Sequence, residues 1–326
     1  MNHPTIGLRG IAVLVLAIGA AVPAREQAPP AQPQVFRSSA DLVPVFGTVT
    51  DKAGRLVPGL TREDFEIRDN GKPQPLTLFD NRPQPIRVIA LVDIAGSVSR
   101  TASILQTACA EFFLQLGTGD LARIGIVGRN VNYSPEFTRS TTQLLAALPT
   151  TAPSGVPMPL WNAVDSAITL FETAPPGRRV ILVFSAGLVG APQYGEKALS
   201  DDEVSDRAQR EDVMIYGIGI KTAITPIGPG RGGSLGAATP SSTPDRGLGR
   251  AADATGGASF DLRGSDDLGQ TFARVAAELH HQYLIGFAPS ARDGKTHKIE
   301  VHLRRSDLKA RARKTYEAPA SRQRAR

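Results

Sequence analysis

The sequence predicts a protein of the α/β class, with a doubly wound and mostly parallel sheet and a small accessory β module. Two observations predict the sheet: its strand-like runs are almost continuously apolar, and helical patterns separate them along the chain. A third observation predicts the β module, because short strand-like runs with turn residues occupy both ends of the chain. The buried strands of the sheet are expected at 87–93, 122–127, 179–184 and 213–220.

The composition is that of a globular protein whose charge is gathered at one end. Of the 326 residues, 41% are hydrophobic and 21% are charged, which is enough to build a buried core. The formal net charge is +6, but residues 302–326 alone hold nine Arg or Lys against two acidic residues. The rest of the chain is nearly neutral, and with the export predicted below this argues against nucleic acid as a partner.

The first 24 residues have the pattern of a signal peptide. Arg9 supplies the positive charge, 11–21 is an apolar run, and a small residue precedes Arg25. The run is shorter than the about 20 residues that span a bilayer, so cleavage is expected, with an uncleaved anchor as the alternative. The mature chain is then expected to be secreted or periplasmic, with no transmembrane segment.

A Pro-rich linker at 25–34 leads into an N-terminal β module at 35–84. Thr61 and Asp64 have capping-box spacing, which predicts a single helical turn. Asp69-Asn70-Gly71 suits a tight hairpin turn between two strands. The strands of this module are expected at 41–50, 65–68 and 76–79.

Residues 85–290 are predicted to form the Rossmann-like α/β domain, because strands and helices alternate throughout this stretch. Its segment 228–247 is rich in Gly, Pro, Ser and Thr and is expected to be a disordered loop. Apolar residues three and four apart predict helices at 99–116, 141–148, 160–171, 247–255 and 266–280, with a short strand at 258–262.

The C-terminal segment, 291–326, is expected to hold β strands and a basic tail. After the last helix, 283–287 and 297–303 are strand-like. The run 308–316 alternates strictly and places Lys309, Arg311 and Arg313 on one face. This alternation predicts an edge strand with a solvated charged face, and an electrostatic binding tail is the alternative. We expect the strands from both chain ends to pack into one module, since neither set is large enough alone.

Residues 93–99, Asp-Ile-Ala-Gly-Ser-Val-Ser, follow the first buried strand and carry a family resemblance. They are similar to the Asp-x-Ser-x-Ser motif of von Willebrand factor A domains. The surrounding order resembles the von Willebrand factor A-related secreted family common in Acidobacteria, with GLTREDFEIRDNGKPQ before the A domain and QYLIGFAP, HKIEVHLRR and LKARARKTY after it. The likeness covers residues 40–317, and it implies the fold of the A domain.

The resemblance also implies a metal-ion-dependent adhesion site at the carboxyl ends of the strands. Mg²⁺ prefers six oxygen ligands, and these domains supply an Asp, two Ser, a Thr and a second Asp. Asp93 and Ser97 match the first Asp and the second Ser. The other three positions hold no side-chain oxygen, unless Thr150 or Thr151 replaces the threonine; they are Ala95, Met158 and Ala186. We therefore expect no metal or cofactor, and if Mg²⁺ or Mn²⁺ does bind, its ligands are Asp93 and Ser97.

The remaining crevice is predicted to bind a partner without a metal, through Asp93, Ala95, Ser97, Ser99, Met158 and Ala186. A purely structural interpretation is also open, because Asp93 and Ser97 precede a helix that they would cap. Trp161, close to Met158, is expected to belong to the core.

These features predict an exported, non-enzymatic binding or adhesion module that contacts a protein or cell-surface partner. No His stands beside a Cys or a carboxylate at a recognised metal-binding spacing, and His297 and His302 project from opposite faces of one strand. The single cysteine, Cys109, falls in a helical run and is expected to be a buried, inert thiol. Two alternatives stay open: a metal-dependent adhesion domain that uses Asp93 and Ser97, and a hydrolase of unknown type.

Overall fold

The computed structural model of the protein describes residues 42–93, 109–148, 158–185, 197–220, 245–262 and 268–320, all within one compact unit, 38–326. The predicted signal peptide and linker lie outside the described residues, as does the predicted loop 228–247 up to residue 244. Within the part of the chain that is described, no helix is both long enough and apolar enough to cross a membrane.

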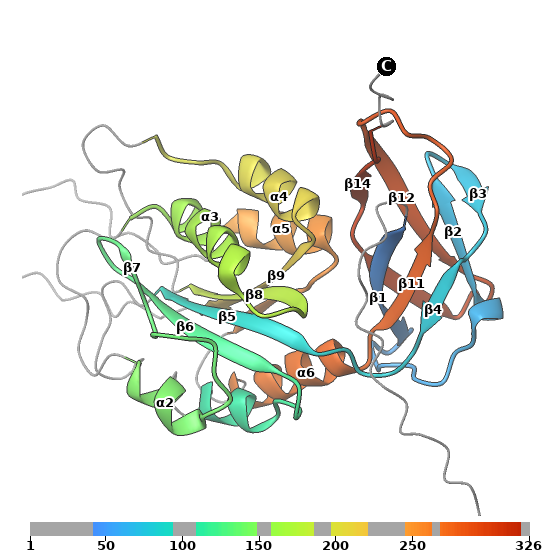
Figure 1. Ribbon diagram of the computed structural model, residues 1–326. Helices are drawn as coiled ribbons and strands as arrows, with labels where there is room; N and C mark the ends of the chain where they lie inside the picture. Colours follow the sequence, from blue (N-terminus) through green and yellow to red (C-terminus); the bar gives the residue numbers. More distant parts are fainter. Residues whose placement is uncertain are drawn as a thin grey trace, which may run out of the picture. The chain divides into compact units, whose positions relative to one another are not determined.

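The central sheet has the doubly wound order that the alternation of strands and helices predicts (Figure 1). In space the order is β10-β9-β8-β5-β6-β7, so the chain starts in the middle, winds outward to one edge, and returns to wind outward to the other. All neighbours are parallel except β7, which runs antiparallel to β6. The strands are β5 (Ile86–Asp93), β6 (Leu121–Val127), β7 (Val131–Tyr133), β8 (Arg178–Ser185), β9 (Val213–Ile220) and β10 (Ser259–Leu262).

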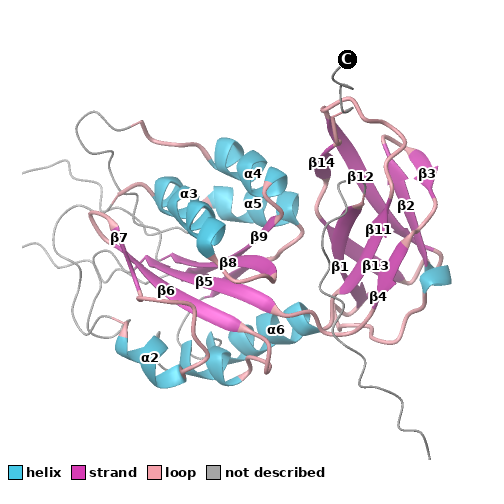
Figure 2. Cartoon of the chain, viewed as in Figure 1, coloured by secondary structure: helices cyan, strands magenta, loops and turns pink. Residues whose placement is uncertain are grey.

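Helices cover both faces of this sheet, which explains why its middle strands are continuously apolar (Figure 2). Val88 of β5 faces the layer formed by α2, α6 and the helical residues 109–114. Ile89, the next residue, faces α3, α4 and α5. The helices are α2 (Thr141–Ala146), α3 (Leu160–Leu170), α4 (Asp201–Arg210), α5 (Arg246–Thr255) and α6 (Leu268–His280), with 3-10 turns η1 (Arg62–Asp64) and η2 (Phe171–Thr173).

The spacing of apolar residues did not predict helix α4. Its sequence, DDEVSDRAQR, offers too few apolar residues to reveal a helical stripe, although Val204 and Ala208 are buried against the sheet layer. A signal was nevertheless present, because Ser200 and Glu203 form a capping box in which Ser200 N donates to Glu203 Oε2 at 3.0 Å.

The strands from the two chain ends form a β sandwich, in two four-stranded sheets ordered β13-β1-β11-β4 and β14-β12-β2-β3. A single apolar cluster fills the space between them, and it includes Val45, Ile67, Tyr283 and Ile299. The strands are β1 (Val43–Asp51), β2 (Phe65–Asp69), β3 (Lys72–Gln74), β4 (Leu78–Asp80), β11 (Tyr283–Phe287), β12 (Thr296–Leu303), β13 (Leu308–Ala312) and β14 (Thr315–Glu317).

Three strands of the sandwich differ from expectation in their pairing. β11, which the predicted boundary at 290 placed in the α/β domain, pairs with β1 and β4, so that Tyr283 and Ile285 fill the sandwich core. The return strand after the Asn70-Gly71 turn is β3, not 76–79, because this turn, with φ of 47° and 79°, closes at once. The predicted strand 308–316 divides into β13 and β14, which join different sheets.

The predicted charged face of 308–316 is solvated only in part. β13 lies at a sheet edge and Lys309 is exposed, as predicted. Arg311, however, pairs with the buried Glu278 of α6, and Arg313 Nη1, just after β13, lies 3.1 Å from Asp212 Oδ1. The two arginine side chains are only 29% and 11% exposed. Period-two alternation identifies a polar face, but it does not distinguish water from a polar protein surface, and here the α/β domain takes the place of water.

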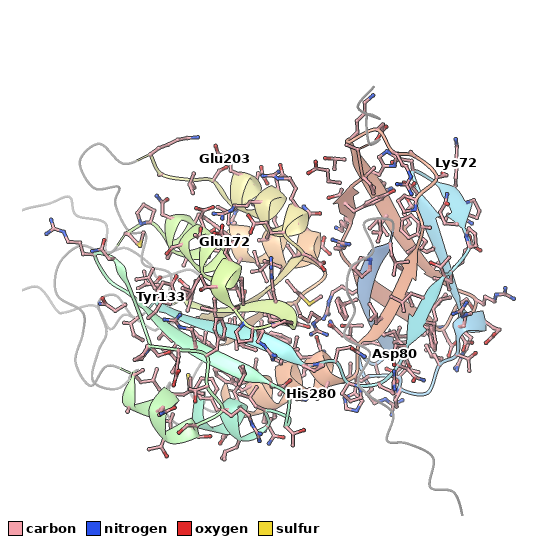
Figure 3. All side chains as sticks on the ribbon, viewed as in Figure 1. Lys72, Asp80, Tyr133, Glu172, Glu203 and His280 are labelled. Carbon is pink, nitrogen blue, oxygen red and sulfur yellow. The ribbon has the colours of Figure 1, made fainter. Side chains whose placement is uncertain are left out.

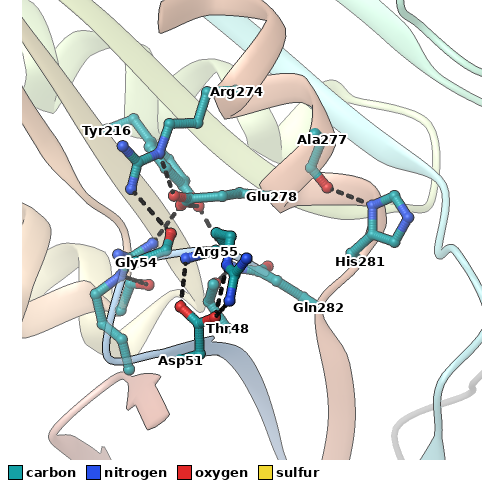
Figure 4. Close-up of polar contacts among 12 residues, drawn as sticks. Thr48, Asp51, Gly54, Arg55, Tyr216, Arg274, Ala277, Glu278, His281 and Gln282 are labelled. Atoms are coloured by element: carbon teal, nitrogen blue, oxygen red, sulfur yellow. Dashed lines mark hydrogen bonds and ion pairs between the residues drawn. The ribbon is translucent and has the colours of Figure 1, made fainter. Parts of the chain in front are cut away.

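A polar network continues this contact between the sandwich and the α/β domain (Figure 4). Gln282 Nε2 donates to Thr48 Oγ1 of β1 at 2.7 Å and to the Tyr216 hydroxyl at 3.3 Å. That hydroxyl in turn donates to Glu278 Oε2 at 3.3 Å. Burial, together with the nearby Glu278 carboxylate, raises the pKa of Tyr216 to about 12, so the phenol stays protonated.

Candidate functional site

The candidate site lies where the winding of the central sheet reverses, between β5 and β8. The helix after β5 leads toward β6 on one side, and β8 leads to β9 on the other, so the connections diverge at this point. Such a point leaves a crevice at the carboxyl ends of the two strands, where ligands of open α/β sheets bind. Asp93 and Ser185 are the last residues of β5 and β8, and they are register partners.

Asp93 and Ser185 make direct contact at this position. Ser185 Oγ donates to Asp93 Oδ2 at 3.0 Å. The two residues are 4% and 1% exposed, so the carboxylate is buried at the end of its strand. A carboxylate removed from water needs donors of this kind, because unsatisfied burial of a charge is costly. Ser185 was not among the predicted site residues, although its place at the end of a buried strand was a usable signal.

Met158 lies at the same edge of the sheet. Its backbone N–H donates to the Gly128 carbonyl, just past the end of β6, at 2.9 Å. The half-buried Met158 is followed by Pro159, which begins α3. Asp93 and Met158 are therefore the predicted site residues that the described structure brings to this edge. The predicted site residues Ala95, Ser97, Ser99 and Ala186 lie outside the described residues, as do Thr150 and Thr151.

Polar contacts link the amino ends of three helices, α3, α4 and α5, at this end of the domain. Trp161 of α3 is core, as expected, at 7% exposure, and its Nε1 donates to Asp245 Oδ2 at 3.1 Å. Asp245 also caps α5 by accepting from the Gly247 N–H at 2.7 Å. Asn162 donates to the Lys197 carbonyl and accepts from the Leu199 N–H, at 3.0 and 2.9 Å. These contacts hold the rim in place.

Figure 3 labels two further groups near this end of the domain: Glu203, in the capping box of α4, and Tyr133, on β7. The Tyr133 hydroxyl donates to Ser166 Oγ of α3 at 3.2 Å. Burial raises the pKa of Tyr133, which keeps the phenol neutral. Both groups are engaged in bonds that position helices, and neither was a predicted site residue.

The residues described between the ends of β5 and β8 do not by themselves supply the ligands that Mg²⁺ prefers. They offer the Asp93 carboxylate, which accepts a hydroxyl at 3.0 Å, and the Ser185 oxygen, with the Met158 thioether at the same edge of the sheet. Mg²⁺ requires near-octahedral oxygen ligation and loses its water reluctantly, and a thioether is a soft ligand. Within the described ranges, no group of three or more His, Cys, Asp or Glu is arranged to hold a metal ion.

The histidines and the cysteine lie apart from the crevice. His280 Nε2 is 2.7 Å from Asp120 Oδ2, beyond the amino end of β6, and His297 Nδ1 is 2.7 Å from Asp69 Oδ1 in the sandwich. His297 is buried and His302 exposed, as alternation along β12 predicts. Cys109 is buried, and burial raises the pKa of its thiol to about 12, which suppresses the reactive thiolate.

The described fold is an α/β domain with a topological switch point between β5 and β8, accompanied by a β sandwich built from strands near the two chain ends. No protein-family model matches the chain, and no curated protein matches it. Among solved structures, the chain is similar to a von Willebrand factor type A protein from Catenulispora acidiphila, with 10% identity and a TM-score of 0.43 over 89% of this chain and 77% of that one.

Two other solved structures show likenesses of the same order. The chain is similar to conserved hypothetical protein BatB from Bacteroides thetaiotaomicron, with 11% identity and a TM-score of 0.41 over 60% of this chain and 98% of that one. It is also similar to proximal thread matrix protein 1 from the mussel byssus, with 11% identity and a TM-score of 0.43 over 64% of this chain. The chain spans 49% of that mussel protein, about half its length. Von Willebrand factor A domains are thus among the solved structures to which this chain is similar.

Proposed function

We propose that the protein is an exported, non-enzymatic binding module that docks a protein or cell-surface partner at the switch-point crevice without a metal ion. The observation that carries the proposal is the pairing of Asp93 with Ser185 at the carboxyl edge of the sheet, to which Met158 also belongs. The carboxylate accepts a hydroxyl from within the protein, and by the family resemblance the apolar Met158 replaces an oxygen ligand of the metal-dependent site. Such a crevice suits contact with a partner better than it suits ion binding.

The absence of catalysis is part of the same proposal. General acid–base or nucleophilic chemistry needs a reactive group within hydrogen-bond reach of its base, in a site that a substrate can enter. The described histidines bond to carboxylates or a backbone carbonyl elsewhere, with His281 Nδ1 2.7 Å from the Ala277 carbonyl oxygen. At the carboxyl ends of β5 and β8, the Ser185 hydroxyl donates to the Asp93 carboxylate at 3.0 Å.

Export is proposed from the N-terminal sequence alone, with its apolar run at 11–21 and small residue before Arg25. The mature chain is then expected to begin at Arg25, which the intact mass of the exported protein measures. A mass that includes the first 24 residues would replace this expectation with a membrane anchor.

Metal independence is tested by thermal unfolding in EDTA, Mg²⁺ and Mn²⁺, because a ligand that binds only the folded state raises its stability. We expect the same unfolding temperature in all three. A rise with either metal that Asp93→Ala abolishes would instead support the metal-dependent alternative, with Asp93 and Ser97 as ligands. Asp245→Ala, which removes a carboxylate from the same edge, controls for general destabilisation.

Binding itself is tested with Met158→Arg, which places a charge at the apolar rim of the crevice. Fluorescently labelled protein is measured on intact cells of the source organism, in EDTA. We expect saturable binding that Met158→Arg reduces at least about tenfold, because a charge replaces an apolar side chain on the contact surface. Leu114→Arg is the matched control, since Leu114 is 71% exposed and lies just before the amino end of β6. Equal loss in both variants would contradict a crevice-specific interface.

A further inference from the structure

The sandwich buries a histidine whose two ring nitrogens each face a carboxylate. The buried residue is His297 of β12. Its Nδ1 is 2.7 Å from Oδ1 of Asp69, the last residue of β2. Its Nε2 is 3.2 Å from Oδ1 of Asp293, in the segment that precedes β12. An ionised carboxylate only accepts hydrogen bonds, so both contacts are hydrogen bonds only when the ring carries a proton on each nitrogen.

The two carboxylates differ in their other surroundings. Asp69 is 4% exposed, and its Oδ2 accepts a hydrogen bond from the Tyr316 hydroxyl of β14 at 3.0 Å. Burial, together with the bond to Asp69, raises the pKa of Tyr316, so this donor keeps its proton. The Asp293 side chain is 41% exposed, and its Oδ1 also accepts from the Lys295 N–H at 3.1 Å. Water can therefore solvate Asp293, whereas Asp69 depends on donors from the protein.

The groups around the ring favour its charged form. Among the described residues, the titratable side chains that face it are Asp69 from β2, Tyr316 from β14 and Asp293 from the segment before β12. Burial opposes the charge on His297, but hydrogen bonds and charge from the two carboxylates outweigh burial and raise the pKa of the ring. The Lys295 N–H, and after it His297, lower the pKa of Asp293, which stays ionised.

The segment that carries Asp293 pairs with the residues that follow β14. Asp293 forms an antiparallel bridge with Ala320, and the Ala318 N–H donates to the Lys295 carbonyl at 2.8 Å. Ala318 is buried and belongs to the apolar cluster of the sandwich. Residues 318–320 are thus held on the sandwich in part by a segment that Asp293 anchors to the imidazole ring.

We propose that His297 is a pH-operated latch, which holds residues 318–320 on the sandwich while its ring is protonated and loosens them when the ring is neutral. A neutral ring keeps one proton, and this proton stays on Nδ1, because Asp69 is nearer and more buried than Asp293. The bare Nε2 then faces the Asp293 carboxylate, and two acceptors at this distance repel each other. Asp293 turns to water, and the bridge to Ala320 loses its side-chain anchor.

The direction of the response follows from the raised pKa of His297. The latch is closed below the ordinary histidine pKa of about 6.5, and it opens as the pH rises through the higher value of the folded protein. This inference does not depend on the proposed partner site, because the ring lies in the sandwich and the switch point lies in the α/β domain.

The test is the hydrogen exchange of the Ala318 N–H, measured by NMR on the purified protein and corrected for the intrinsic pH dependence of exchange. We expect its protection to fall about fivefold between about pH 6 and about pH 8.5, as the loss of one partly exposed ion pair allows. Asp293→Asn is expected to remove this fall, because an amide accepts from a protonated ring and donates to a neutral one. Asp307→Asn is the matched control: it also removes an exposed carboxylate, but the partner of that carboxylate is Arg305, at 2.9 Å.

Constant protection in the wild-type protein would overturn the proposal, as would an equal fall in Asp293→Asn. The nitrogen chemical shifts of the His297 ring give a second test without any variant, since they report which nitrogen carries the proton. A neutral ring protonated on Nδ1 supports the latch. A neutral ring protonated on Nε2, which keeps its bond to Asp293, overturns it.

Discussion

The two ends of β8 bury polar groups in opposite ways. At the carboxyl end, Ser185 meets Asp93 of the adjacent strand, and the carboxylate receives a hydroxyl donor from its own sheet. At the amino end, Arg178 meets Phe46 and Arg313, which come from distant parts of the chain, and two of its donors have no partner in the described residues. A polar group inside a sheet can form its hydrogen bonds with a register partner on the adjacent strand. A polar group at a contact between two substructures depends on hydrogen-bond partners from the second substructure or from a bound ion.

The largest expected effect belongs to the buried charge pair at the contact with the sandwich. Glu278, 1% exposed, pairs with Arg311, so Glu278→Leu leaves the Arg311 charge without its partner. We expect this variant to lose about 3 kcal/mol of unfolding free energy, measured with urea. The double variant Glu278→Leu with Arg311→Leu is expected to recover most of the loss. If the single variant is as stable as the double, the pair does not hold the two parts together.

A smaller effect is expected at the carboxyl end of β8. Ser185→Ala removes one donor from a carboxylate that is 4% exposed, which should cost about 1–2 kcal/mol in the same urea measurement. Ser166→Ala is the control, because it removes a hydroxyl that accepts from the half-buried Tyr133 at 3.2 Å and should cost about 0.5 kcal/mol. Equal costs would mean that the Asp93 carboxylate is satisfied without Ser185.

The smallest effect is a pH dependence within the sandwich, where His297 lies between two carboxylates. Desolvation lowers its pKa, but hydrogen bonds and charge from Asp69 and Asp293, at 2.7 and 3.2 Å, outweigh this and raise the pKa overall. A raised pKa in the folded state means that protonation stabilises the fold. This stabilisation is full below the unfolded-state pKa of about 6.5 and disappears as pH rises through the folded-state value.

His297→Gln should therefore flatten the stability profile above about pH 6.5. The measurement is the urea midpoint of wild type and variant at several pH values. The difference between the two proteins should shrink as pH rises. His302→Gln is the control, since His302 is exposed. A difference that is constant across the pH range would show that His297 contributes packing and not charge.

Particular elements show which parts of the fold the sequence patterns could predict. The apolar strands were predictable because both faces of the sheet are covered, and the Asn70-Gly71 turn because its positive φ values restrict the residue types. Helix α4 was missed by periodicity because its buried face rests on few apolar residues, although the Ser200–Glu203 capping box marked its start. The sheet edge at which Asp93 lies was predictable, since Asp93 ends a buried strand. The end of a second buried strand pointed to Ser185 in the same way, but its pairing with Asp93 was not predictable, because strand order is a tertiary property.

By itself, the sequence determined the α/β class, the positions of the main strands and the two residues, Asp93 and Met158, that reach the switch-point edge in the described structure. Local periodicity, turn chemistry and a short motif are enough for this, since each depends on neighbours along the chain. Only the tertiary structure decided that β11 joins the sandwich, that Arg311 and Arg313 face protein instead of water, and that Arg178 lines a cavity with them. These outcomes depend on which surfaces meet across long sequence separations, and a charged residue has the same local pattern whether it meets water, a carboxylate or an ion.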